Sequence, residues 1–597
     1  FKYTIYLLTF GFLVSACNFL DKEPAKMTQD GYFNSETEAY SFLTGIYAIL
    51  GQSSFYGEDY LCLVGGDDMQ HYGGASTRAP MNRGLICANT VSSDPAGTAL
   101  WFSLYSGINR ANIFLENIGK VIEISDDKRK QYISEARFLR AFFYFTLVQN
   151  WGDVPFKENS TKGVVNLDIP RTDRQQIYDF IITEMSEAAD KETGGLLSAE
   201  ALGKQVGRVS RSAAWAMIAR VYLFRAGEHY RQNRPATQEE QVTYFQKASE
   251  YAQMVMNENY HELVKNYWDV FIDLCSNEYN STDKNESIWE VEFAGNGTSD
   301  ARTEGRWGNT CGLAGPDLSN NDNIIGSADP GYSYEQIFAT PKLYQLYDAN
   351  GDKERFYWNL AQFKYVEEEK NTGVTGRLFR SKETMEEILG TFGNWGRGTY
   401  SYGDPKLDET DPAKPKFLNK GDYYNTSASE DQGLACAKFR REYEADKKGK
   451  TFTSINFPLM RYSDVLLMVA EAENEANAVP TTLAYNCLND VRSRAGIATI
   501  AEGSLDKDGF RQAVKDERAM ELCFELTRRH DLIRWGEFVD NMKEIPVKYN
   551  DSKIWKQINV NPVLNYFSNV DEKYNYFPIP DQEMSVNKKI TENNPGW

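Results

Sequence analysis

Hydrophobic residues recur at three- and four-residue steps through most of this 597-residue chain, and this spacing predicts amphipathic helices. The most apolar of these segments covers residues 138–156. Within it, Leu139, Phe143 and Leu147 share one helical face, and the segment closes on a Gly-Asp-Val-Pro stop. We expect this helix to be deeply buried, because so many apolar side chains need neighbouring helices to cover them.

The other segments with this period pair along the chain as helical hairpins. A helix at residues 100–118 is joined to the apolar helix by a short link, and alanines recur where such helices would cross. This pattern is similar to tetratricopeptide hairpins with a degraded consensus, and we count about four hairpins. The predicted helices cover residues 36–50, 100–118, 138–156, 175–191, 210–226, 239–258, 462–477, 481–495 and 510–535.

Two stretches lack the helical period. Residues 51–97 are rich in Gly, Ser, Asn and Asp, and we expect a long loop there. An insertion at about residues 261–456 contains an alternating strand at residues 287–293 and a short helix at residues 341–347. Its Gly-rich stretches carry interleaved aromatic residues. Two Pro-fixed segments near the end of the chain, residues 576–580 and 593–597, are expected to lie extended over the helices.

The first residues have the pattern of a lipoprotein signal peptide. Lys2 precedes an apolar run at residues 5–14, which is too short to span a bilayer. The run closes on Ser15-Ala16-Cys17, and small residues before a cysteine are the substrate of lipoprotein signal peptidase. We predict a signal peptide at residues 1–16, lipidation of Cys17, a tether at 17–30 and one domain at 31–597. An ordinary signal peptide with an incidental cysteine is the alternative.

Charge and cysteine usage exclude several classes of function. The formal net charge is -20 and Lys and Arg are scattered, which argues against binding of nucleic acid. The eight Cys show no CxxC spacing and the four His no HExxH, so no zinc or thioredoxin-like site is supported. Cys487 and Cys523 lie in apolar helical patterns and are expected to be buried. A disulfide between Cys62 and Cys87 remains open.

Short motifs in a fixed order, covering nearly the whole chain, resemble the SusD/RagB family of outer-membrane nutrient-binding lipoproteins of Bacteroidetes. The motifs are moderately specific singly and highly specific in this order. The segments at residues 51–100 and 295–405 match regions in which family members differ most, so the resemblance does not identify a substrate. The motifs are Cys17 with Phe19-Leu20-Asp21, Leu104-Tyr105 to Arg110-Ala111-Asn112, Glu135 to Ala141, Asn150 to Pro155, Arg461 to Leu467, Glu471-Ala472, Asn489 to Gly496, Glu517 to Glu525, Arg534-Trp535-Gly536 and Pro578 to Pro580.

The resemblance implies a mainly α fold with four tetratricopeptide-like hairpins in a right-handed scaffold. The scaffold would take in about residues 31–260 and 457–597, and the loop-rich insertion with short strands about residues 261–456. The resemblance also implies that the protein is anchored by lipid in the cell outer membrane and faces outwards. The expected partner is a SusC-like TonB-dependent transporter, over which the protein would act as a hinged lid. The expected ligand is an oligosaccharide or polysaccharide fragment, or a peptide in a RagB-like minority. No catalysis, cofactor or metal is expected.

The aromatic content of 13% exceeds what core packing usually needs in so polar a chain. A sugar ring has an apolar face and a rim of hydroxyls, so flat aromatic rings flanked by polar side chains suit it. Loops on a rigid scaffold could present such a surface. We assign Trp151 and Trp535, in framework motifs, to packing. The candidate ligand contacts, each of which could instead anchor a loop or pack, are His71, Tyr72, Arg78, Trp101, Trp307, Asn309, Tyr332, Tyr334, Trp395, Arg397, Tyr400 and Tyr402.

Four alternatives stay open at this point. The acidic and basic residues between Glu517 and Arg534 could form an active site, but we favour an ion-pair network fastening the last hairpin, with Glu525 and Arg529 paired on one helix. Asp348 to Asp352 faintly resembles a calcium loop without its final Glu. A glycoside hydrolase would need two carboxylates across a cleft, and nothing singles out such a pair. A pure protein-interaction scaffold is the fourth alternative.

Overall fold

The computed structural model describes residues 33–72, 90–163, 168–227, 237–279, 285–294, 305–313, 331–361, 407–408, 411–415, 435–444, 452–551 and 566–597. Within these ranges the protein is mainly helical, as the sequence predicts, and its strands are short. The scaffold helices are α2 (Glu36–Tyr47), α3 (Asp59–Val64), α5 (Pro95–Asn117), α6 (Asp126–Trp151), α7 (Arg174–Ala189), α8 (Ala199–Leu202), α9 (Arg211–Gly227), α10 (Gln238–Glu258), α16 (Tyr462–Ala476), α17 (Thr482–Arg494), α18 (Lys507–Leu522), α19 (Arg528–Arg534), α20 (Phe538–Asp551) and α22 (Asp581–Val586).

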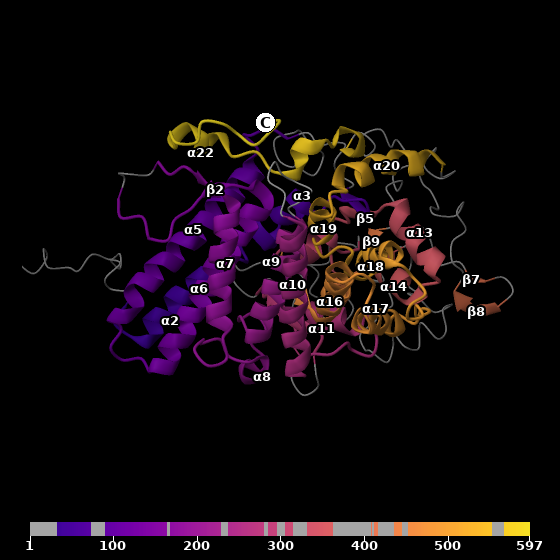
Figure 1. The fold of residues 1–597 in the computed structure, drawn as a ribbon, viewed down its shortest axis with the longest axis horizontal. Coiled ribbons are helices and arrows are strands. Elements are labelled where there is room, and N and C mark those ends of the chain that lie inside the picture. Colours follow the sequence, from indigo (N-terminus) through magenta and orange to yellow (C-terminus); the bar gives the residue numbers. More distant parts are fainter. Residues whose placement is uncertain are drawn as a thin grey trace, which may run out of the picture.

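The insertion contributes several short helices and strands (Figure 1). Its helices are α11 (Asp269–Ser276), α12 (Trp307–Cys311), α13 (Pro341–Asn350) and α14 (Lys353–Asn359). The strands of the chain are β1 (Gln70–Tyr72), β2 (Val154–Pro155), β3 (Arg171–Thr172), β4 (Ser287–Val291), β5 (Ile337–Ala339), β6 (Leu360–Ala361), β7 (Leu407–Asp408), β8 (Asp411–Pro415), β9 (Ala435–Cys436) and β10 (Phe457–Arg461). Strands β1, β5, β9 and β6 form a four-stranded antiparallel sheet in that order.

The scaffold helices form one continuous stack. Each of α5, α6, α7, α9 and α10 packs on the next, and α10 then packs on α16, which packs on α17 and α18. Figure 1 shows α10 and α16 side by side although the whole insertion separates them in sequence. The insertion therefore leaves the stack uninterrupted, and the helical pairs predicted on either side of it belong to one scaffold.

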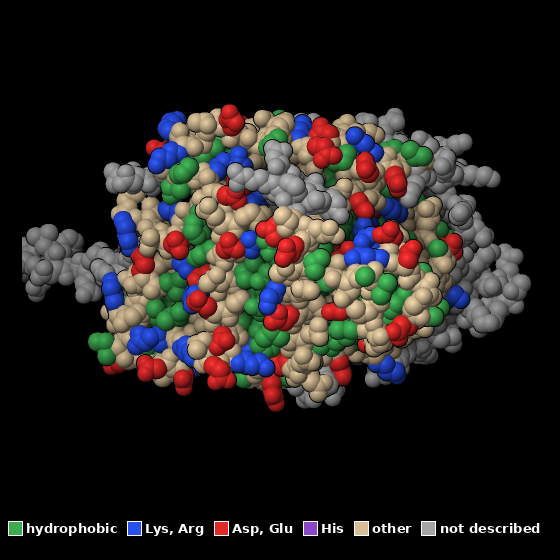
Figure 2. Space-filling model, viewed as in Figure 1, with side chains coloured by type: hydrophobic (Ala, Val, Ile, Leu, Met, Phe, Trp, Pro, Cys, Tyr) green, Lys and Arg blue, Asp and Glu red, His purple; other side chains and the backbone are tan. Residues whose placement is uncertain are grey.

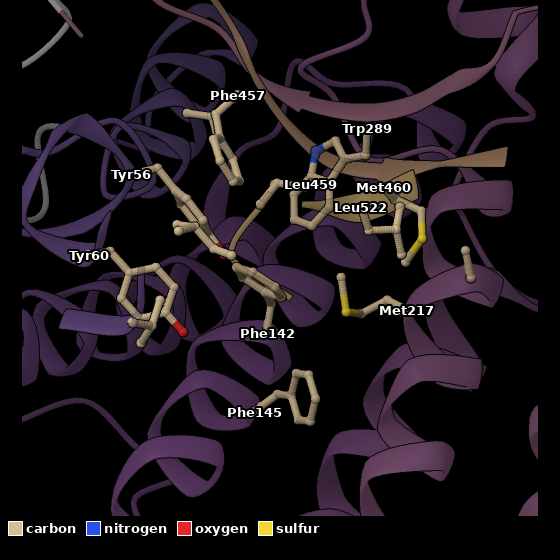
Figure 3. Packing of buried hydrophobic residues seen from close by; sticks show 14 of the residues in the cluster. Tyr56, Tyr60, Phe142, Phe145, Met217, Trp289, Phe457, Leu459, Met460 and Leu522 are labelled. Carbon is tan, nitrogen blue, oxygen red and sulfur yellow. The ribbon is translucent and has the colours of Figure 1, made fainter. Parts of the chain in front are cut away.

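Helix α6 lies in the core of this stack, as its apolar pattern predicts. Almost every residue from Gln131 to its end is buried. Phe142 and Phe145 project from α6 towards Tyr56 and Met217 (Figure 3), and the ring of Phe142 lies 5.1 Å from that of Trp289. Helix α5 packs closely on α6 at Gly107, where an added Cβ would lie 2.5 Å from the Phe143 ring. Only glycine permits that approach.

The C-terminal segments lie over the end of α6, as predicted. The Trp151 indole donates to the Pro578 carbonyl (2.9 Å), and the Phe577 amide donates to the Asn150 carbonyl (2.7 Å). Asn594 donates to the carbonyls of Trp151 and Phe577 at 2.9 and 2.7 Å. These bonds satisfy backbone groups at the helix end that would otherwise lack partners.

Two local predictions were wrong, and a third, the strand at residues 287–293, was confirmed with a different burial pattern. The segment at residues 51–72 is not a loop, because it contains a π-helical turn (Ser53–Gly57), α3 and β1, most of them buried. The strand at residues 287–293 exists as β4, paired antiparallel with β10, but all five of its residues are buried because both faces are covered. The helix predicted at residues 510–535 breaks between α18 and α19, where Phe524 and Leu526 have φ of 65° and 60°.

A buried lattice of ion pairs joins the insertion to the scaffold. Glu521 of α18 accepts from Arg461 (3.1 Å), Arg355 (3.0 Å) and Arg494 (2.5 Å), and its side chain is fully buried. Lys438 of the insertion donates to Glu525 and to two backbone carbonyls of residues 521 and 523. Buried charges are tolerated only when they are paired in this way, so the lattice fixes the insertion relative to α18.

Candidate functional site

Two candidate residues, Tyr332 and Tyr334, form an aromatic pair at the surface of the insertion. The Tyr334 side chain is exposed (38%) and that of Tyr332 is half-buried. Their ring centroids lie 5.2 Å apart and the rings are nearly perpendicular, at 85°. Tyrosine combines an aromatic ring with a phenolic hydroxyl group, and this combination suits the apolar face and the hydroxyl rim of a sugar ring.

Helix α12 carries this aromatic pair. The Tyr334 amide donates to the Asn309 carbonyl (2.8 Å), and the Asn309 side chain donates to the Tyr332 carbonyl (3.1 Å). The hydroxyl of Ser333 donates to the Gly308 carbonyl at 3.0 Å. Trp307, the first residue of α12, packs edge-on against Phe457 (4.7 Å between ring centroids). The two tyrosines are therefore held by bonds to a buried helix rather than by a free loop.

Trp307 and Asn309 are not surface residues, contrary to prediction. Their relative exposures are 1% and 0%, and both belong to the layer beneath the tyrosine pair. The glycines around them explain the error. An added Cβ at Gly308 would lie 2.4 Å from Ile455, and one at Gly305 would lie 2.5 Å from Phe293. These glycines permit close packing of the backbone, whereas the sequence suggested an exposed loop.

His71, Tyr72 and Trp101 are also buried, each at 1% exposure. The surface location predicted for His71 and Tyr72 is wrong, whereas for Trp101, which could have served either role, the structure shows packing. The imidazole of His71 stacks on Phe338 of β5 (5.8 Å between centroids), and the Tyr72 hydroxyl donates to Gln336. Trp101 packs edge-on against Trp151 at 5.3 Å, inside the α5–α6 hairpin. His71 and Tyr72 therefore connect β1 to Phe338 and Gln336, which follow the tyrosine pair in the chain.

The remaining predicted residues lie outside the described residues. These are Cys17, Arg78, Trp395, Arg397, Tyr400 and Tyr402, together with Cys87 of the open disulfide question. Cys487 and Cys523 are buried free thiols, as expected from their helical patterns.

The sequence did not reveal Arg441, a residue behind the tyrosine pair. Its guanidinium is buried (2% exposed) and donates to the Tyr332 carbonyl (2.5 Å) and to the Phe452 carbonyl (3.2 Å). It also donates to Glu444 at 2.7 Å. Because Arg441 lies more than a hundred residues from Tyr332 along the chain, no local pattern could have connected them.

The acidic and basic residues of α18 and α19 form an internal ion-pair network, as favoured from the sequence. Arg518 pairs with Asp464 and Asp531 at 2.7 and 2.8 Å, and Arg534 pairs with Glu471. Burial would raise the pKa of Asp531, but Arg518 and Arg534 outweigh it and lower that pKa. The prediction that Glu525 pairs with Arg529 was wrong. Glu525 lies in the break between α18 and α19 and pairs with Lys438 and Arg461.

The acidic turn at Asp348 to Asp352 links two helices. Asp352 accepts from the Arg355 amide (3.2 Å) as the N-cap of α14 and pairs with the Arg355 guanidinium (2.5 Å). Burial raises the pKa of Asp352 to about 6, although Arg355 opposes the shift. In the part of the chain that the structure describes, no group of three or more His, Cys, Asp or Glu side chains is arranged to hold a metal ion.

A hollow of about 370 Å³ lies on the scaffold between α10 and α18. Its charged groups are paired with one another, as in Arg511 with Glu475 (2.6 Å) and Lys515 with Glu537 (2.6 Å). Trp535 lines it and donates to Glu471 (2.8 Å), consistent with the packing role predicted for this residue. Figure 2 shows acidic and basic side chains intermixed over the visible face, with hydrophobic side chains gathered between α7 and α10. That mixture is unlike a nucleic-acid surface.

None of the helices in the described ranges combines the length and the hydropathy of a membrane span.

Two family models match the chain. One, described as the SusD family, matches residues 285–597, and another, described as starch-binding and associating with the outer membrane, matches residues 18–223. A SusD-like protein of Formosa agariphila is 26% identical over 98% of this chain and 97% of its own length. The starch-binding protein SusD of Bacteroides thetaiotaomicron is 25% identical over 81% of this chain and 76% of its own.

Solved structures show the same fold. A SusD homologue from Bacteroides thetaiotaomicron superposes with a TM-score of 0.73 at 23% identity, covering 96% of this chain and 100% of its own. A laminarin-binding SusD-like protein superposes with a TM-score of 0.63 at 20% identity, covering 95% of this chain and 100% of its own. At these identities the likeness concerns the fold, and both the helical stack and the insertion fall within the covered length.

Proposed function

The chain belongs to the SusD family, and from this premise we propose that it captures a glycan at the cell surface. The ligand is an oligosaccharide or a polysaccharide fragment. The protein delivers it to a SusC-like TonB-dependent transporter in the outer membrane. The proposal includes lipidation of Cys17, which would hold the domain at the outer face of that membrane.

The observation that carries the proposal is the Tyr332–Tyr334 pair on its buried frame. Ring faces and phenolic hydroxyls suit the apolar face and the hydroxyl rim of a sugar. A surface fixed before binding loses less conformational entropy when the ligand arrives, and the bonds from α12 and Arg441 provide that fixation. The names of the relatives support the same ligand class, since one is a starch-binding protein and another is a laminarin-binding protein.

The proposal includes no catalysis. The acidic residues of α18 and α19 that could suggest an active site are engaged by arginines, as with Glu521 and Asp531. A hydrolase needs one carboxylic acid and one carboxylate facing a shared cleft. Relatives of this chain carry names that denote binding.

Isothermal titration of the purified chain tests the function. The titrants are laminarin, soluble starch, xylan and pectin fragments, and a pool of tryptic peptides as the contrasting ligand class. We expect heat of binding with at least one glycan and none with the peptides, and the bound glycan should be recovered with its length unchanged. Binding of peptides alone would overturn the glycan class, and shorter glycan products would overturn the absence of catalysis.

A further inference from the structure

The segment from Gly331 to Gln336, which bears the tyrosine pair, has no regular secondary structure of its own. One side of it is bonded to α12, as described above. Glu335, directly after the pair, has φ of 49°, a left-handed conformation that a non-glycine residue adopts only when its surroundings hold it there. The orientation of the pair therefore depends on contacts from outside the segment.

Arg441 supplies a second contact to the segment, at the Tyr332 carbonyl that also accepts from Asn309. Its guanidinium bonds three separate parts of the chain, namely the carbonyl of Tyr332, the carboxylate of Glu444 and the carbonyl of Phe452. Glu444 is itself fixed, because it accepts from the Ser454 amide at 2.8 Å. Both side chains are buried, Arg441 at 2% and Glu444 at 4% exposure. The planar guanidinium fork directs its donors at fixed angles, which a lysine ammonium cannot reproduce.

We propose that Arg441, oriented by Glu444, is the positioning residue that sets the tyrosine pair for ligand binding. This inference rests on the proposed function for the statement that the pair binds a glycan. The positioning itself is a property of the chain and is measurable without ligand. Arg441 acts through the Tyr332 carbonyl and does not itself contact the ligand.

Substitution of Arg441 by Lys separates positioning from charge. Lysine keeps the positive charge that Glu444 requires, but a single ammonium cannot bond the carbonyls of both Tyr332 and Phe452 while it pairs with Glu444. Replacement of Glu444 by Gln is the milder companion, because the amide keeps an acceptor for Arg441 and removes the charge. Glu250→Gln, at an exposed pair with Lys247 on α10, is the matched control.

Hydrogen exchange followed by mass spectrometry measures the positioning. A charge-assisted hydrogen bond is worth about 1.5–3 kcal/mol, and 1.4 kcal/mol is tenfold in an equilibrium. We therefore expect amides of residues 331–336 to exchange at least about tenfold faster in Arg441→Lys, and to a smaller extent in Glu444→Gln. Exchange in α6 and in α16 should be unchanged. Glu250→Gln should match the wild type in all segments.

Titration with the glycan that the wild type binds gives the second readout. Arg441→Lys should weaken binding about tenfold, with exchange in α6 unchanged. Unchanged exchange in residues 331–336, or equal acceleration throughout the protein, would overturn the positioning role. If Arg441→Lys accelerates exchange only in residues 331–336 but the wild type binds no glycan, the positioning role stands and the proposed function is overturned. If Arg441→Lys does not fold, the same comparison of exchange in residues 331–336 is made with Glu444→Gln, and the same results support or overturn the positioning role.

Discussion

Replacing Glu521 by Gln should cause a large loss of stability, because this carboxylate is the centre of the buried lattice. It accepts from Arg461, Arg355 and Arg494, and no part of its side chain reaches solvent. Glutamine has nearly the same volume, so the change removes one charge and places an amide N–H₂ group among guanidinium donors. Breaking a buried pair by removing one partner costs about 3–5 kcal/mol, and we expect Glu521→Gln to fall in this range.

The control is Glu250→Gln, which removes the same charge from an exposed pair. The side chains of Lys247 and Glu250 are 46% and 57% exposed, and exposed pairs contribute about 0–1 kcal/mol. The free energy of unfolding is measured by urea denaturation with circular dichroism at neutral pH. A loss for Glu521→Gln as small as that for Glu250→Gln would refute the reasoning.

The pH dependence of this effect has a definite sign. Burial alone would raise the pKa of Glu521, but Arg494, Arg461 and Arg355 outweigh burial and hold that pKa well below its ordinary range. The stabilising contribution of Glu521 is therefore present above about pH 4, the ordinary glutamate pKa, and is lost as the pH falls through the folded value. The difference between wild type and Glu521→Gln should narrow below about pH 4.

Further predictions address other parts of the chain. Burial raises the pKa of Glu290 to about 7, so its ionisation destabilises the fold as the pH rises from about 4 to 7. Glu290→Gln should therefore remove a pH-dependent loss of about 3 kcal/mol. The free energy of unfolding is measured by urea denaturation at pH 5 and at pH 8, and an equal change between these two pH values in both proteins would contradict the prediction. Phe142→Ala, in the core between α6 and Trp289, should cost about 3–5 kcal/mol, and a cost below about 1 kcal/mol by the same assay would contradict the packing. Cys17→Ala should move the full-length protein from the membrane fraction to the soluble fraction, and retention in the membrane fraction would contradict the anchor.

The helical scaffold was predictable because its signal is repeated many times. The 3.6-residue period places Leu139, Phe143 and Leu147 on one face of α6 whatever surrounds it, and the predicted ends of the helices differ from the observed ends by only a few residues in most cases. The break between α18 and α19 was not predictable. There Glu525 leaves the helical path to meet Lys438 and Arg461, and both partners lie more than sixty residues away.

The sequence proposed candidate ligand contacts, and the structure shows which of them are buried and which are exposed. Composition cannot distinguish Trp307, which is buried, from Tyr334, which is exposed, because both are aromatic residues among glycines. The difference arises from close packing of Gly308 on Ile455 and from the bonds of Arg441. Both are contacts between segments distant in sequence, so they exist only in the folded chain.

Binding of a glycan by the Tyr332→Ala/Tyr334→Ala double variant tests the central claim most directly. The wild-type chain and the variant are titrated with the same glycan by calorimetry, with Tyr222→Ala on the scaffold face as the control for loss of a half-buried tyrosine. Loss of the stacking and hydroxyl contacts of both rings should weaken binding at least tenfold, which corresponds to about 1.4 kcal/mol. Tyr222→Ala should bind as the wild type does. Equal affinity of the double variant and the wild type would contradict the assignment of the ligand site to this aromatic pair.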